Sequence, residues 1–241
     1  LYRAGQMRVL VSDEVGLGKT LIARGTIAKL AKLQKESGDK LVKVVYVCSN
    51  ASIAEQNLNK LRITSELKTE STSSSRLSMQ HLNIFRQEND TELLNRYIQL
   101  IPLTPDTSFR MTSGAGIVSE RALMYAILRR MPELSMYRKA LEVAMADKAV
   151  GQWDGWARDW YETQVKECDK TSGGKYLAYM LDKLSVELNM RADEDNTVLD
   201  MIISMCKQIR SNRYKQQNNN AVIGKLRVIF AKISLDKLEP D

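Results

Sequence analysis

Residues Asp13–Thr20 have the residue types of a loop that holds the phosphates of a nucleoside triphosphate: Asp-Glu-Val-Gly-Leu-Gly-Lys-Thr. The glycines allow a tight turn that points backbone N–H groups at an anion. Lys19 is expected to reach the β- and γ-phosphates, and the Thr20 hydroxyl to ligate Mg²⁺. The apolar run Val9–Val11 comes before the loop and a helical pattern follows it, so a helix N-terminus should face the phosphates. An ordinary glycine-rich turn is the alternative, and this strand-to-helix context argues against it.

The strict form of this loop has Gly or Ala where this chain has Asp13. The variant resembles the phosphate loop of superfamily-two helicases, especially the Swi/Snf-like translocases and related bacterial proteins of the DEAD/DEAH type, in which Asp is common at this position. Two further stretches are similar to later motifs of the same proteins: 44–57, a strand that leads into a helix, and Leu103–Phe109, at the end of a later strand. The resemblance covers roughly the first 110 residues.

The resemblance implies ATP and Mg²⁺ as cofactors, DNA or RNA as partner, and movement on the nucleic acid driven by ATP hydrolysis. Lys19 would act on the transferred phosphoryl group, and Thr20 would hold the metal. The implied nucleotide-binding residues are Glu14, Val15, Gly16, Leu17, Gly18, Lys19 and Thr20. The implied nucleic-acid-binding residues lie at or just beyond the carboxyl ends of two predicted strands, where open α/β sheets place ligands; they are Ser49, Asn50, Gln56, Thr104 and Thr107.

The hydrophobic periodicity predicts an α/β fold with a largely helical insertion. The resemblance implies that the sheet is a partial RecA-like sheet. We expect residues 1–118 to belong to the ATP-binding lobe and residues 119–241 to form the insertion. The predicted strands are Arg8–Ser12, Lys43–Cys48 and Tyr97–Leu103. The predicted helices are Lys19–Lys35, a helix opened by a capping box at Ser52–Glu55, Ser119–Arg130, Glu133–Ala149, Gly151–Lys170, Lys175–Met190, Thr197–Tyr214 and Ala221–Lys237. Met79–Phe85 is ambiguous.

An ATPase of this kind also needs an acidic box after an apolar strand, to complete Mg²⁺ coordination and to position the attacking water. The Asp-Glu pairs of this chain are Asp13-Glu14, inside the loop, and Asp193-Glu194, which follows no predicted strand. We therefore expect a fragment of a longer enzyme that stops just before the box. Such a fragment should bind ATP and not hydrolyse it alone.

The composition suits a soluble globular protein, and the net charge of +7 fits a polyanionic partner as readily as an ordinary basic surface. We expect no membrane span, because the chain has no apolar run of about 18 residues. Three cysteines without paired spacing favour a reducing, cytoplasmic location over disulfides or a zinc site.

Trp153, Trp156 and Trp160 fall on one face of a predicted helix, which favours a buried stripe over a platform that stacks on bases. His81, the one histidine, is expected to be structural. Two other functions stay open: an ATPase switch that never tracks nucleic acid, and a non-enzymatic scaffold in which the helical insertion binds a protein partner.

Overall fold

The computed structural model describes residues 8–12, 18–39, 41–63, 76–88, 98–105, 108, 115–213 and 216–239. The predicted loop residues Glu14, Val15, Gly16 and Leu17 lie outside these ranges, as does Thr107. The side chains of residues 51, 87, 88 and 216–218 are also outside the description.

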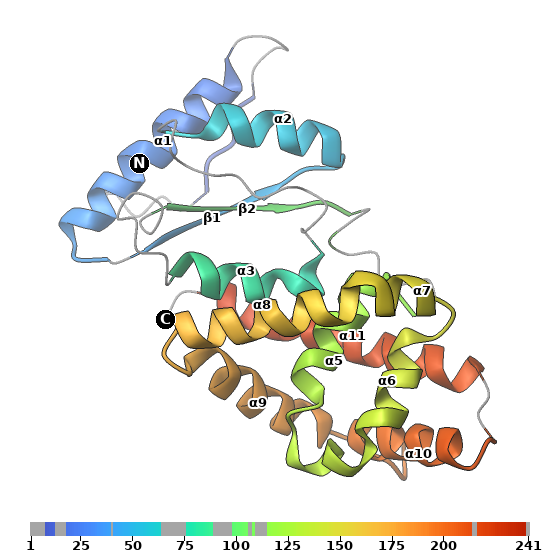
Figure 1. Cartoon of the computed structure of the whole chain (residues 1–241). Helices are drawn as coiled ribbons and strands as arrows, with labels where there is room; N and C mark the ends of the chain where they lie inside the picture. Colours follow the sequence, from blue (N-terminus) through green and yellow to red (C-terminus); the bar gives the residue numbers. More distant parts are fainter. Residues whose placement is uncertain are drawn as a thin grey trace.

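A parallel two-stranded sheet lies between helices in the N-terminal part of the described chain (Figure 1). Two helices, α1 and α2, cover one face, and α3 covers the other. The strands pair in register, with Val42 opposite Ile98 and Val47 opposite Leu103. The elements are α1 (Lys19–Glu36), β1 (Val42–Val47), α2 (Ala51–Leu61), α3 (Leu77–Glu88) and β2 (Ile98–Leu103). The predicted α/β class is confirmed.

The side chains of β2 alternate between the two faces of the sheet, so this strand packs against helices on both sides. Successive side chains of a strand point to opposite faces. Ile101 and Leu103 pack with residues of α3 and α11, whereas Leu100 packs with Leu58 and Leu61 of α2. The strand is therefore buried on both faces, as strands of parallel sheets usually are.

The C-terminal part is a block of helices around one hydrophobic core. Its central helix is α5, whose side chains are buried along almost its whole length. The ambiguous segment Met79–Phe85 is helical and lies within α3, whose Met79, Leu82 and Phe85 join this same core. The elements are α5 (Val118–Leu128), the 3₁₀ helix η3 (Pro132–Tyr137), α6 (Arg138–Ala146), α7 (Val150–Gln152), the π-helical turn η4 (Trp153–Ala157), α8 (Arg158–Thr171), α9 (Lys175–Leu188), α10 (Val198–Arg210) and α11 (Gln216–Leu238).

The predicted first strand, Arg8–Ser12, is wrong for this structure. These residues have no regular secondary structure, and Leu10 is 89% exposed. An apolar run becomes a strand only where a neighbouring strand takes up its N–H and C=O groups. In the described part of the chain β1 pairs with β2, and neither pairs with residues 8–12.

The predicted tryptophan stripe is correct at Trp153 and wrong at the other two positions. Trp153 is 1% exposed, whereas Trp156 is 46% and Trp160 is 56% exposed. The cause is η4, in which hydrogen bonds from residue i to residue i+5 widen the turn, so that each residue advances by a smaller angle than in an α-helix. Trp156 and Trp160 are thereby rotated away from the buried face on which Trp153 lies.

A buried ion pair within the helical block also contacts the start of α3, on the sheet side of the molecule. Glu120 of α5 and Arg227 of α11 are each 1% exposed, with 3.3 Å between Glu120 Oε1 and Arg227 Nε. Ser78 Oγ donates to Glu120 Oε1 at 2.6 Å, and Arg76 Nη1 lies 3.2 Å from Glu120 Oε2. The backbone N–H of Ile117 also donates to Oε2, at 3.1 Å. Both oxygens of this buried carboxylate are therefore satisfied, as burial requires.

Gly116 allows this close approach. Its φ of +70° is a conformation that side-chain-bearing residues rarely adopt. A Cβ at this position would lie 2.6 Å from Glu120 Oε2 and 2.7 Å from Arg227 Nε, so there is no room for one.

A second buried polar cluster surrounds His81, which is fully enclosed between α3, α9 and α11. His81 Nε2 lies 3.1 Å from the carbonyl oxygen of Ser78, and Nδ1 lies 3.1 Å from Tyr176 Oη. The neutral ring with its proton on Nε2 satisfies both contacts, because Tyr176 then donates to Nδ1. Burial lowers the pKa of His81 to about 3. The prediction of a structural histidine is consistent with this position.

Glu120→Ala should lower the free energy of unfolding by about 3–5 kcal/mol, because it leaves Arg227 buried without its carboxylate. Arg227→Ala should cost a similar amount, and the double variant less than the sum of the two. Urea denaturation measures all three. Asp236→Ala, which breaks a half-exposed pair with Lys183, is the control and should cost no more than about 1 kcal/mol. Additive losses at positions 120 and 227 would contradict the coupling.

Acid should destabilise the protein through His81. The pKa of this group is about 3 in the folded state and about 6.5 in the unfolded chain. Between these values the unfolded chain binds the extra proton, so stability falls as the pH drops through this window, by up to ~1.4 kcal/mol per pH unit. Urea midpoints between pH 5 and pH 6.5, above the range of most carboxylates, measure this slope. His81→Gln should flatten it; an unchanged slope in that variant would show that His81 is not the cause.

Candidate functional site

The N-terminus of α1 is the described part of the predicted phosphate site. Gly18 is its N-cap residue, with φ of 82° and ψ of 22°, a left-handed conformation that favours glycine. The carbonyl of Gly18 accepts the first helical bonds, from the N–H groups of Leu21 and Ile22. Lys19 is exposed and Thr20 is half-buried. The positive end of an 18-residue helix thus carries a cationic side chain and a hydroxyl in its first turn.

These features fit a nucleotide phosphate and its metal ion. A helix N-terminus favours an anion, Lys19 adds a positive charge, and Thr20 offers an oxygen, the type of ligand that Mg²⁺ prefers. Within the described ranges no group of three or more His, Cys, Asp or Glu side chains could hold a metal ion. Thr20 is therefore expected to be one ligand of the metal ion, and the nucleotide phosphates would be further ligands.

The carboxyl ends of β1 and β2 lie together at one edge of the sheet. Val47 is in register with Leu103, and the N–H of Cys48 donates to the carbonyl of Leu103 at 3.0 Å. Ser49 and Asn50 therefore follow β1 next to the point where Thr104 follows β2. Because α1 runs back along the sheet before β1 begins, its N-terminus points toward this same end (Figure 1).

Asn50 has a structural role that the sequence reasoning assigned to Ser52. Its Oδ1 accepts the backbone N–H groups of Ser52, at 2.8 Å, and of Ile53, at 3.3 Å. Asn50 is therefore the N-cap of α2, and the predicted capping box at Ser52–Glu55 is displaced by two residues. The signal for this was present, because Asn is among the most favourable N-cap residues.

The predicted nucleic-acid-binding residues differ in accessibility. Ser49, Asn50 and Gln56 are exposed, and Thr104 is fully buried. The backbone N–H of Thr104 donates to Ser108 Oγ at 2.9 Å, and its carbonyl accepts from the N–H of Ser108 at 2.8 Å. The carbonyl of Ser108 in turn accepts from the N–H of Leu77 at the start of α3. Ser108, which the sequence reasoning passed over, fixes the end of β2 to α3.

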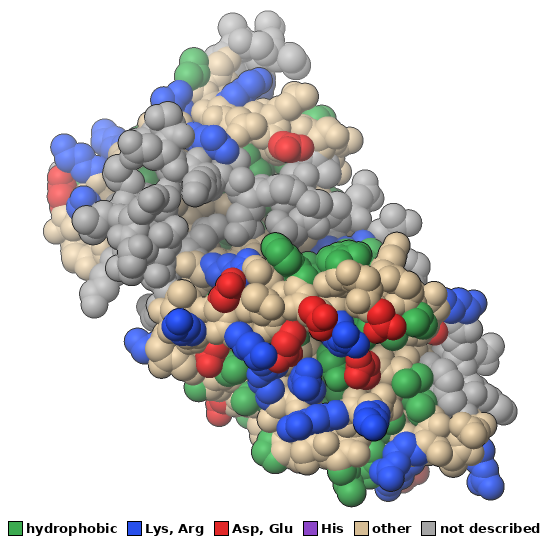
Figure 2. All heavy atoms as spheres, viewed as in Figure 1, with side chains coloured by type: hydrophobic (Ala, Val, Ile, Leu, Met, Phe, Trp, Pro, Cys, Tyr) green, Lys and Arg blue, Asp and Glu red, His purple; other side chains and the backbone are tan. Residues whose placement is uncertain are grey.

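Basic side chains gather on the same side of the sheet as α1 (Figure 2). Helix α1 carries five Lys and Arg residues, and Glu36 is its one acidic residue.

On α2, Asn57 Nδ2 donates to Tyr46 Oη at 2.8 Å, which ties this helix to β1. That hydrogen bond lowers the pKa of Tyr46, but burial, the larger effect, raises the pKa above the usual value.

Residues 2–101 match the protein family described as "Type III restriction enzyme, res subunit". The match is to a domain of the superfamily-two helicase kind, and it indicates an ATP-binding domain. It spans the predicted phosphate loop, α1, β1, α2, α3 and most of β2, but not the helical block that begins at α5. Neither the curated proteins nor the solved structures that were compared gave a match.

Two general properties accompany this site. Within the described residues no helix is long and apolar enough to cross a membrane.

Cys48, Cys168 and Cys206 are free thiols, and burial raises the pKa of Cys206 to about 12, which keeps this thiol protonated and unreactive.

Asn50→Ala should lower the free energy of unfolding by about 0.5–2 kcal/mol, because α2 loses its cap. Asn50→Ser should retain most of the stability, since a hydroxyl can also accept from the first turn. Thermal or urea unfolding measures both. Ser52→Ala is the control for the capping box predicted from the sequence, and a larger loss in this variant than in Asn50→Ala would contradict the assignment.

Proposed function

We propose that this chain contains the ATP-binding part of an ATP-dependent helicase or translocase that moves on DNA or RNA. The observation that carries the proposal is the start of α1, where left-handed Gly18, Lys19 and Thr20 stand within the segment that matches the restriction-enzyme subunit family. Residues 1–118 would form this lobe, and residues 119–241 the helical insertion.

Lys19 and Thr20 have distinct roles in this proposal. Lys19 would neutralise charge on the β- and γ-phosphates, and it is the residue that we assign to catalysis. Thr20 would give its hydroxyl to Mg²⁺, and backbone N–H groups of the loop Glu14–Gly18 would hold the phosphates. Bound ATP and Mg²⁺ would supply the phosphoryl group and the charge that stabilises its transfer.

The nucleic acid would lie along the edge where the strands end. Ser49, Asn50 and Gln56 are exposed there or on the helix that follows, and short polar side chains of this kind bind phosphates and sugars without reading sequence. Thr104 would have to be uncovered before it could contribute, because it is buried in the turn closed by Ser108. Thr107 belongs to the same proposed surface.

Hydrolysis needs an acidic group after a strand, and Asp193-Glu194 does not provide one. These residues lie in the connection between α9 and α10, where Asp193 Oδ1 accepts the backbone N–H groups of Asp195 and Asn196. We therefore propose that the site at Lys19 and Thr20 binds ATP and that Asp193 and Glu194 do not serve as its acidic box.

Lys19→Ala should weaken binding of ATP by about tenfold or more, because a hydrogen bond to a charged group contributes about 1.5–3 kcal/mol. Titration calorimetry of the 241-residue chain with ATP and Mg²⁺ measures the dissociation constant. Lys29→Ala, which removes an exposed lysine two to three turns further along α1, is the matched control and should bind like the wild type. Equal affinity of the Lys19→Ala variant and the wild type would refute the site.

A second measurement separates the proposed helicase from an ATPase switch or a scaffold. Fluorescence anisotropy with labelled single-stranded DNA and RNA should show binding that weakens with salt, as phosphate contacts require. Binding of ATP without any binding of nucleic acid would favour the switch. The matched family is a restriction enzyme subunit by description, so DNA is the first ligand to test.

A further inference from the structure

Two tryptophan side chains stand half in solvent on the helical block. Trp156 is 46% and Trp160 is 56% exposed, and they lie one turn apart on the same face of the segment from η4 to α8. Figure 2 shows hydrophobic side chains gathered over the α7 to α8 segment. Large aromatic side chains in water are costly, and a group of them marks an interaction surface more often than an accident.

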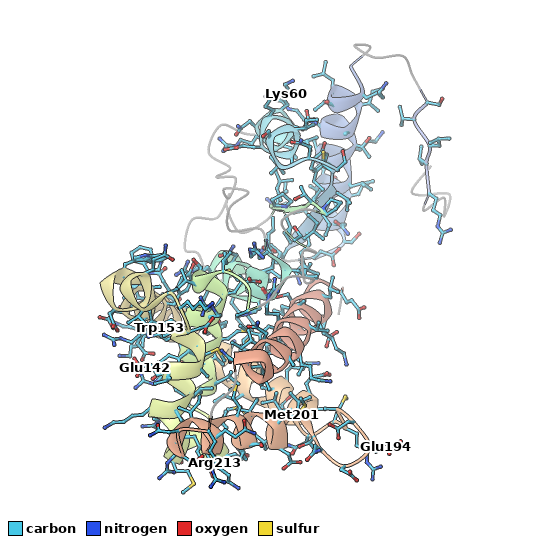
Figure 3. All side chains as sticks on the ribbon, turned by 90° about the vertical axis from the view of Figure 1, so that its right-hand side faces the viewer. Lys60, Glu142, Trp153, Glu194, Met201 and Arg213 are labelled. Carbon is cyan, nitrogen blue, oxygen red and sulfur yellow. The ribbon has the colours of Figure 1, made fainter. Side chains whose placement is uncertain are left out.

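The backbone beneath these side chains is held firmly. Glu142 of α6 accepts from Trp153 Nε1 at 3.4 Å and from Tyr125 Oη at 3.2 Å, and Arg158 Nη1 lies 3.1 Å from Glu142 Oε1. Figure 3 shows Glu142 and Trp153 close together on the side of the block formed by α6 and η4. Turns of the π type inside helices occur often at functional sites. The two exposed rings are thus presented on a fixed support, which lowers the entropy lost on binding.

The cluster of charges next to the two rings is acidic, although the chain as a whole carries +7. Three carboxylates, those of Glu142, Asp154 and Asp159, pair with the one guanidinium of Arg158. Asp154 and Asp159, next to the rings, have side chains that are 58% and 76% exposed, and they share Arg158 as an ion-pair partner. Hydrogen bonding to Arg158 lowers the pKa of Asp159, so this carboxylate stays ionised at neutral pH. A phosphate backbone would meet net repulsion here.

We propose that the surface formed by Trp156, Trp160, Asp154 and Asp159, here called the tryptophan face, docks a protein segment with an apolar stripe flanked by Lys or Arg side chains. Tryptophan is among the residues that carry most binding energy in protein interfaces. An amphipathic helix could lay its apolar side chains against the two rings and bring its cations to the two carboxylates. The tryptophan face is separate from Lys19 and Thr20, so this inference stands whether or not the chain binds ATP.

The test uses a synthetic helical peptide of about 14 Leu and Lys residues, roughly four turns long, and a matched peptide of Leu and Glu. Tryptophan emission and calorimetry follow binding to the 241-residue chain. The Leu/Lys peptide should bind and shift the emission to shorter wavelength, because the exposed rings become buried. The double variant Trp156→Ser with Trp160→Ser should bind at least tenfold more weakly. Asp154→Asn with Asp159→Asn should weaken binding severalfold and reduce its salt dependence.

A matched control pair lies on and just beyond α9. Val186 and Met190 are also exposed and also four residues apart, so Val186→Ser with Met190→Ser removes a similar apolar surface elsewhere. This variant should bind the Leu/Lys peptide like the wild type. If the serine substitutions at positions 156 and 160 unfold the chain, the asparagine variants, which change only exposed carboxylates, still decide the charge requirement.

Four outcomes would overturn the proposal. The first is that wild type and the tryptophan variant bind the Leu/Lys peptide equally, and the second is that the Leu/Glu peptide binds as well as the Leu/Lys peptide. The third is that oligothymidine changes the emission more than the Leu/Lys peptide does. The fourth is that sedimentation shows a dimer which the tryptophan variant abolishes. The third would make the surface a base-stacking platform, and the fourth would make it an interface between two copies of this chain. Failure to bind ATP would leave all of these results unaffected.

Discussion

The carboxylate of Glu120 is the group on which the joint between the two halves of this structure depends. It meets Arg227 from α11, Arg76 and Ser78 from the start of α3, and the backbone of Ile117 before α5. A charge so deeply buried is tolerated only with all these partners in place, so the three segments must come together or not at all. Helix α3 packs against β2 on one side and α11 on the other, which makes the sheet and the helical block mechanically continuous.

Local pattern was enough for most of the helices and for both strands. The periodicity of Lys19–Lys35 and of the segments after residue 118 predicted helices, and helical structure is present in all of them with shifted ends. Two predicted helices are divided: Glu133–Ala149 begins as the 3₁₀ helix η3, and Gly151–Lys170 is interrupted by the π-helical turn η4. Contacts between residues far apart in the sequence could not be predicted from local pattern. The partners Glu120 and Arg227 are 107 residues apart, and nothing in either neighbourhood indicates the other. Val9–Val11 failed for the same reason, since a strand depends on a neighbour that its own residues do not specify.

At the candidate site too, features set by neighbouring residues could be predicted and features set by distant residues could not. Gly18, Lys19 and Thr20 are contiguous, so the sequence alone could predict that they lie together at the start of a helix, with Gly18 in the left-handed conformation that glycine allows. Their roles toward a nucleotide stay a prediction. The meeting of Ser49 and Thr104 at one edge followed from the rule that parallel strands end together. The burial of Thr104 did not follow, because it results from the turn that Ser108 closes. Asn50 was predicted to be a ligand-binding residue and also caps α2, a role that competes for the same side-chain oxygen.

The π-helical turn η4 sets the phase of the helix that follows it. On a helix of regular pitch, Trp153 and Val165 would point about 120° apart, and both could not lie in one core. The wider turn removes most of that difference, so Trp153, Ala157, Val165 and Cys168 form one continuous buried face. The rotation that completes this face also carries Trp156 and Trp160 outward, as a stutter does in a coiled coil. The packing of the core and the exposure of Trp156 and Trp160 therefore have a single geometric origin. A deletion or substitution that restored regular α-helical pitch would change the buried face and the exposed pair together.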